Sequence, residues 1–255
     1  MKKTLLLFIF GLLLCFGGRG LYCEIKEYRD GEEEYAELQQ YVVKIENKED
    51  GQTSIGDENT NTDETITEVF EVNFETLKTL NSDCIAWISI PGTNIHYPVV
   101  NGSDNSYYVT HTFGKKRNKS GAIFLDMRNS SDFSDLNSVI YGHNLKNSKM
   151  FSDLKRFLEK SYFDEKREII VYTPKKEYRY EIFAVYKTME DDSTYHVKFT
   201  EQEFEEHLKS ISAKAEILKT SEEEVNRIIT LSTCSNNVEG ERIVVIGRLV
   251  ESKEE

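Results

Sequence analysis

Short β-type segments separated by turn residues dominate the chain from Ile85 to Val250. In the clearest of them, at 178–186, apolar and aromatic side chains occupy alternate positions, which is the period of a strand with one buried face: Tyr178, Tyr180, Ile182, Ala184 and Tyr186. Further apolar runs occur at 97–100, 122–125, 138–141, 169–172, 227–231 and 243–250. Many short strands with only a few helices predict a mainly β fold, a barrel or a sandwich, that carries helical inserts.

Apolar side chains at helical spacing predict one helix before these segments, at 69–81, and two helices among them, at 151–162 and 200–217. The third begins at Thr200, which forms a capping box with Glu203. The first opens the globular domain, which we expect to span residues 67–255.

The first 23 residues have the pattern of a targeting segment. Lys2 and Lys3 precede an apolar run at 5–16, as in an export signal. The run is shorter than the roughly 20 residues of a membrane helix, and it reaches that length only if Arg19 snorkels to the interface. No small-residue cleavage site follows, which favours an uncleaved signal anchor over 1–23 rather than a cleaved signal. A single-pass anchor with its lysines inside would hold the rest of the chain outside the cell membrane.

Most of the negative charge follows this segment. The chain carries a net charge of −13 at pH 7, and residues 24–71 alone hold 16 acidic and 4 basic residues. Residues 35–45 have helical spacing, whereas residues 47–65 are polar and predict a flexible linker. We therefore expect residues 24–66 to form an acidic juxtamembrane stalk and linker. The rest of the chain is nearly balanced in charge, which argues against a nucleic-acid partner.

The cysteines and histidines limit the possible chemistry. The cysteines are Cys15, Cys23, Cys84 and Cys234. Because Cys15 lies in the predicted anchor, at least one of the others is unpaired within the chain, which makes it a candidate reactive thiol. Most lone cysteines are nevertheless small buried side chains. The histidines form no metal-ligand cluster, and we expect no metal and no cofactor: His96, His111, His143, His196 and His207.

Three residues with useful chemistry lie at predicted strand ends. Cys234 ends the run Thr230-Leu231-Ser232-Thr233-Cys234. His143 ends another strand directly after Gly142, which we expect to allow an unusual backbone angle. Arg242 opens the last strand after a turn. Each residue alone is more often structural or merely exposed.

Together these residue types fit nucleophilic attack on a carbonyl. A thiol attacks as the thiolate, which a nearby imidazolium or guanidinium favours. Histidine can also protonate a leaving amine. Arginine, with backbone amides, can stabilise the negative charge that develops on the carbonyl oxygen.

The same residues resemble a known family. TLSTC at 230–234 followed by Arg242 resembles the sortase signature TLxTC…R, and YGHN at 141–144 resembles that family's histidine motif. Segments upstream of these motifs also resemble sortase segments and follow one another in the same order: Trp87-Ile88, Ile90-Pro91-Gly92-Thr93, Tyr97-Pro98-Val99-Val100, Asp104-Asn105, Tyr108 and Gly121-Ala122-Ile123-Phe124-Leu125-Asp126. The resemblance covers roughly residues 70–250. Helical material before Trp87 and the helix at 200–217 make the chain most similar to class B sortases, although His96 stands where an acidic residue is expected.

The resemblance implies a sortase-like closed β-barrel of about eight strands, with N-terminal helices and a long helix inserted between late strands. It places the active site at one end of the barrel. Cys234 would be the nucleophile, His143 its acid and base, and Arg242 the group that holds the oxyanion or the substrate backbone. The resemblance also suggests residues that line the substrate groove, although they are equally well explained as ordinary strand-end residues: Asn105, Val109, Ser232 and Thr233.

The implied partners are secreted proteins that carry a C-terminal sorting motif related to LPxTG or NPxTN. The enzyme would cleave the motif, form a thioacyl intermediate and join the protein to an amine of a lipid-linked peptidoglycan precursor. Two alternatives stay open on the sequence alone. A cysteine peptidase that releases peptides to water would use the same residues, and a non-catalytic surface-binding module would use none of them.

Overall fold

The computed structural model describes residues 2–45, 69–165, 168–220, 224–235 and 237–254, with side chains described from residue 17 onward except at 21 and 69. The predicted flexible linker at 47–65 lies outside the described residues.

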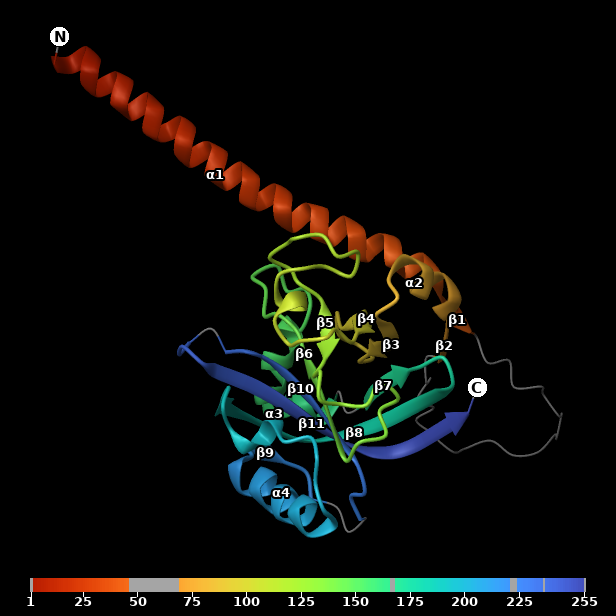
Figure 1. Cartoon of the computed structure of the whole chain (residues 1–255). Helices are drawn as coiled ribbons and strands as arrows, with labels where there is room; N and C mark the ends of the chain where they lie inside the picture. The colour runs from red at the N-terminus through yellow and green to blue at the C-terminus, as the bar shows by residue number, and fades with distance from the viewer. Residues whose placement is uncertain (1, 46–68, 166–167, 221–223, 236, 255) are drawn as a thin grey trace, which may run out of the picture.

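Within the described residues, eight strands close into a barrel in the order β11-β10-β6-β5-β4-β3-β7-β8, and β8 pairs with β11 to complete the circle (Figure 1). A further short strand, β9, extends the sheet from β8. The strands are β3 (Cys84–Ser89), β4 (His96–Val100), β5 (Ile123–Leu125), β6 (Asn137–Tyr141), β7 (Glu168–Tyr172), β8 (Lys176–Met189), β9 (Ile217–Leu218), β10 (Ile228–Cys234) and β11 (Glu241–Glu254). The prediction of a mainly β fold with a closed barrel of about eight strands is confirmed.

The barrel closes because β8 and β11 are long and are paired along most of their length. Their antiparallel register runs from Glu241 opposite Met189 to Glu254 opposite Lys176, with irregularities that bend the pair. At one irregularity Gly247 leaves room for the neighbouring strand, since a Cβ there would lie 2.9 Å from the Cβ of Tyr180. The closed barrel excludes water from a continuous core, and burial of its apolar surface stabilises the fold.

The remaining elements are α1 (Lys2–Leu38), η1 (Gln39–Tyr41), β1 (Val42–Ile45), β2 (Val69–Val72), α2 (Phe74–Leu80), η2 (Tyr107–Val109), η3 (Ser152–Leu158), α3 (Lys160–Glu165), η4 (Ser193–Tyr195) and α4 (Glu201–Lys214). The insert α4 has the predicted capping box. The first predicted helix starts later than expected, because Val69–Val72 pair with Val42–Ile45 as a two-stranded sheet. β-branched residues favour such pairing over helix, which also ends the helical pattern at 35–45 early.

Residues of the expected stalk pack against the barrel. The α1 helix is continuous across the predicted boundary at residue 23, and Tyr35 and Leu38 are buried in the main core. The division of the chain at residue 67 stays a prediction.

The predicted membrane anchor is contradicted. In the part of the chain that the structure describes, no helix has both the length and the apolar content needed to cross a membrane. The described side chains of α1 are largely charged or polar from Arg19 to Glu37. This finding overturns the single-pass anchor expected over 1–23 and the localisation that depended on it.

The inserted helix α4 gives the fold a pH dependence through His207. This side chain is 7% exposed, and its Nε2 has no hydrogen-bond partner among the described residues. Burial, helped by the positive charges of Lys214 and His196, lowers the pKa of His207 to about 4. The folded pKa lies below the unfolded one, so the unfolded chain binds more protons between pH 6.5 and 4, and stability falls as the pH is lowered through this window.

We therefore expect the wild-type protein to lose about 2 kcal/mol of unfolding free energy through His207 between pH 7 and pH 4. Urea unfolding at several pH values measures the loss. The variant His207→Leu, which cannot bind a proton, should have a flatter curve across this range. A curve for His207→Leu as steep as that of the wild type would show that another group causes the dependence.

Candidate active site

Strand pairing brings the predicted site residues to one end of the barrel. Strands β10 and β6 are parallel neighbours, with Ser232 opposite Tyr141, so their carboxyl ends reach the same edge. Cys234 ends β10, and His143 follows β6 by two residues. Strand β11 is antiparallel to β10 and places Arg242 directly opposite Cys234.

A pocket of about 240 Å³ lies at this edge, and all seven predicted site residues line it: Asn105, Val109, His143, Ser232, Thr233, Cys234 and Arg242. The structure therefore brings together all seven residues that the sequence analysis predicted as catalytic or substrate-binding. Phe124, Tyr141, Gly142, Glu190 and Tyr195 complete the lining and were not predicted as site residues.

Side-chain and backbone bonds tie the two strand ends together around Cys234. The Oγ1 of Thr233 donates to the carbonyl of Gly142 at 2.7 Å, and the amide of Gly142 donates to the carbonyl of Ser232 at 3.1 Å. The Nδ2 of Asn144 donates to the carbonyl of Cys234 at 2.8 Å. The half-buried thiol of Cys234 therefore lies on a rigid backbone, which limits its positions relative to the rest of the pocket.

His143 is held by the backbone of Val109, the last residue of η2. Its Nε2 lies 2.6 Å from the carbonyl oxygen of Val109, and because a carbonyl only accepts, Nε2 donates in this bond. Its own carbonyl accepts from the amide of Phe151 at 2.9 Å. The bond to Val109 thus holds the imidazole at Nε2, and the bond from Phe151 holds the backbone of His143.

The expected role of Gly142 is wrong in its detail. Its φ is not in the left-handed region. Instead, a Cβ at this position would lie 2.4 Å from Cδ1 of Ile123 and 2.7 Å from Cγ of Phe151, so glycine is required by close packing. Gly121, beside the imidazole of His143, is one of the described glycines that do have a left-handed backbone, with a φ of 56°.

Arg242 is oriented by a carboxylate that the sequence did not reveal. Its Nη2 forms an ion pair with Glu190, and its Nη1 donates to the carbonyl of Glu241 at 3.3 Å. The amide of Glu190 donates to the carbonyl of Gly240 at 2.9 Å, which fixes the chain directly after β8. Because the Glu190 side chain is 60% exposed, the pair adds little to stability and mainly orients the guanidinium. No local motif marks Glu190, since only the register of β8 with β11 brings it to Arg242.

Two tyrosines form a wall of the pocket. The hydroxyl of Tyr195 lies 3.0 Å from the Oγ of Ser232, and burial raises the pKa of Tyr195 to about 12, so the hydroxyl stays neutral. Tyr141 donates to the fully buried carboxylate of Asp126 at 2.9 Å.

The negative charge of the buried Asp126 carboxylate is compensated by a bidentate contact with Arg128. Arg128 donates to both oxygens of Asp126, at 2.8 Å and 2.7 Å, and to the carbonyl of Tyr195 at 3.0 Å. Burial alone would raise the pKa of Asp126, but the bonds from Arg128 and Tyr141 outweigh it and lower the pKa. An anionic Asp126 therefore holds Tyr141 directly and holds the backbone of Tyr195 through Arg128.

Comparisons with known proteins agree with this geometry. A sortase domain model matches residues 88–250. Sortase B of Listeria monocytogenes is 38% identical over 180 residues, covering 68% of this chain and 72% of that protein. Sortase B of Staphylococcus aureus is 32% identical over 182 residues, covering 69% of this chain and 74% of that protein. The X-ray structure of Clostridium perfringens sortase B matches with a TM-score of 0.66 and 35% identity, covering 70% of this chain and all of that one.

The family match extends from β3 to β11 and includes every strand that carries a pocket residue. Both sortase B relatives are more than 30% identical to this chain over about 180 residues. The chain therefore belongs to the sortase family and is a cysteine transpeptidase of class B.

Proposed function

We propose that the enzyme cleaves a C-terminal sorting motif of secreted proteins, related to LPxTG or NPxTN, and joins them to an amine of a peptidoglycan precursor. Sortases as a family attach proteins to the cell wall, and the proposal adds the motif, the acceptor and the residues. The single observation that supports it most is the register of the barrel. It lets a thiol, an imidazole and a guanidinium that are distant in the chain share one pocket.

In the first half-reaction, the thiolate of Cys234 attacks the carbonyl carbon of the motif's threonine. A tetrahedral oxyanion forms, and Arg242 with nearby backbone amides stabilises it. The C–N bond then breaks, His143 gives its proton to the departing amine, and a thioester to Cys234 remains.

In the second half-reaction, a primary amine attacks the thioester carbonyl. His143 takes a proton from the amine, the C–S bond breaks, and Cys234 returns as the thiolate. The product is an amide between the secreted protein and the acceptor. The tyrosine wall, with Asn105, Val109, Ser232 and Thr233, is proposed to hold the extended motif beside the sulfur.

An amine acceptor distinguishes this function from the alternatives. We expect mass spectrometry of enzyme, motif peptide and a primary-amine peptide to show ligated product that increases with amine concentration while the hydrolysed acid decreases. The same acceptor with an acetylated N-terminus is the matched control and should give no ligation.

A pure hydrolase would give the same amount of acid with or without the free amine. A binding module would leave the motif peptide intact. Either result, obtained over a panel that includes LPxTG and NPxTN peptides, would contradict the proposal.

A further inference from the structure

The C-terminal half of α1 lies along the loop between η2 and β5, residues 110–121, which leads to the pocket (Figure 1). Several hydrogen bonds join the two. The carbonyl of Glu27 accepts from Nδ2 of Asn118 at 2.7 Å, and the Glu27 side chain accepts from the amide of Lys119 at 2.8 Å. The Glu34 side chain accepts from the amide of Gly114 at 2.7 Å. These bonds hold the loop against this side of α1.

Tyr35 of α1 bonds to both ends of the loop segment 113–121 through its hydroxyl. It is 6% exposed, and its hydroxyl donates to the carbonyl of Gly121 at 2.6 Å and accepts from the amide of Phe113 at 3.2 Å. Its ring packs edge-on against Tyr97 with centroids 5.5 Å apart. Burial raises the pKa of Tyr35 far above its usual range, so the hydroxyl keeps the proton that it donates to Gly121.

Gly121 lies between Tyr35 and the imidazole of His143. A Cβ on Gly121 would be 2.8 Å from Cδ2 of His143 and 2.7 Å from the carbonyl oxygen of Val109. That same oxygen accepts the bond from Nε2 of His143. With no spare space at this point, a shift of the Gly121 backbone would move either the ring or the atom that holds it.

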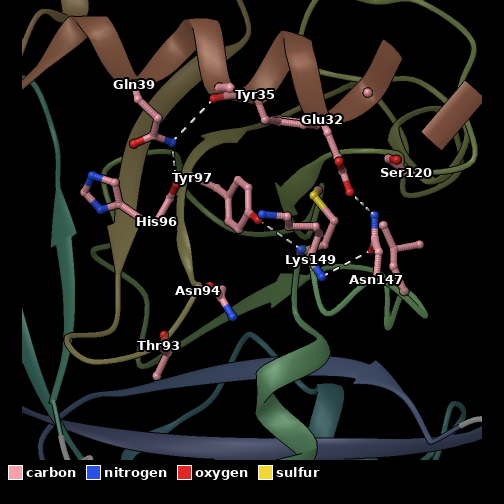
Figure 2. A pocket seen from close by; sticks show the side chains of 14 residues that line it. Glu32, Tyr35, Gln39, Thr93, Asn94, His96, Tyr97, Ser120, Asn147 and Lys149 are labelled. Carbon is pink, nitrogen blue, oxygen red and sulfur yellow. Dashed lines mark hydrogen bonds between the residues drawn. The ribbon is translucent and has the colours of Figure 1, made fainter. Parts of the chain in front are cut away.

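α1 also holds the chain on the other side of His143. Figure 2 shows Glu32 pointing to Asn147, whose Nδ2 donates to the carboxylate at 2.6 Å. The hydroxyl of Tyr97, which packs on Tyr35, accepts from the amide of Met150 at 3.2 Å. Asn147 and Met150 belong to the segment that directly follows His143. The helix therefore contacts the loop before the imidazole and the loop after it.

We propose that Tyr35 is a positioning residue for His143, and that α1 acts through it to fix the imidazole for proton transfer. The proposal rests on the role of His143 proposed above. Under this proposal the hydroxyl of Tyr35 affects the reaction only through the position of His143. Tyr35 itself lies on a helix outside the barrel and does not line the active-site pocket.

The test compares Tyr35→Phe with Glu34→Gln in the full chain. Tyr35→Phe keeps the ring that packs on Tyr97 and removes the hydroxyl. Glu34→Gln weakens a neighbouring bond from α1 to the same loop at Gly114, whereas Gly121 is the glycine whose Cβ position lies beside His143. Kinetics with a motif peptide and an amine are measured well below the melting temperature of both variants, so that both are folded.

We expect Tyr35→Phe to lower kcat about tenfold with an unchanged KM for the peptide, because a small displacement of a catalytic group costs rate and not substrate binding. Glu34→Gln should stay within about twofold of the wild type in both constants. Equal kcat values for Tyr35→Phe and the wild type, equal losses in the two variants, or a change in KM alone would each overturn the positioning role. An inactive wild type would instead refute the proposed function.

Discussion

Replacing Cys234 by alanine is expected to lower the rate of motif cleavage and of ligation by at least about 10³-fold, to the level of a reaction without enzyme. The proposed chemistry forms a bond between the sulfur and the acyl group, and alanine has no atom that can form it. The substitution removes one sulfur from a half-buried site and should leave the barrel folded. Product analysis by mass spectrometry measures the rates.

The chain provides matched controls for this variant. Cys84 is 1% exposed on β3, and burial raises the pKa of its thiol to about 12, so it is inert at neutral pH. Cys23 is exposed on α1, away from the pocket lining. Cys23→Ala and Cys84→Ala should both keep the activity of the wild type in the folded protein. Activity that survives Cys234→Ala, or that is lost in Cys23→Ala, would contradict the assigned nucleophile.

The second large effect is expected at Arg242. Arg242→Lys keeps the positive charge and can still pair with Glu190, but it loses the planar fork of the guanidinium. If that fork stabilises the oxyanion, kcat should fall about 10²-fold while KM for the peptide changes much less. Steady-state kinetics on the purified variant separates the two constants.

A matched control lies on the same strand. Arg248 of β11 donates to Glu181 through Nε and Nη2 and does not line the pocket. Arg248→Lys therefore tests what the same substitution does to the barrel alone, and we expect a loss of stability without a loss of kcat in the folded protein. Full activity in Arg242→Lys, or equal losses of kcat in the two variants, would count against the oxyanion role.

Regular alternation, as at 178–186 in β8, predicted a mainly β fold that is a barrel or a sandwich, and the resemblance to sortases implied the closed barrel. Cys234, His143 and Arg242 lie next to strand ends, where pairing decides which residues meet, and the resemblance implied that they share one site at the end of the barrel. The alternation did not show that β8 pairs with β11 to close the barrel, since alternation gives the faces of a strand but not its partner.

Other parts of the site depend on contacts that leave no local pattern. Glu190 follows β8 among other acidic residues, and only the tertiary fold pairs it with Arg242. Tyr35 lies in the segment where the high density of charge predicts an acidic stalk. Its burial depends on a groove between α1 and the barrel that the sequence does not specify. Such residues need a structure to be recognised.

The most direct measurement of the central claim is intact-protein mass spectrometry of the enzyme during turnover of a motif peptide, followed by peptide mapping. We predict a mass increase equal to the acyl half of the peptide, located on Cys234 and removed when a primary amine is added. Product formation with no adduct, or an adduct that maps to Cys23 or Cys84, would contradict the thioacyl mechanism.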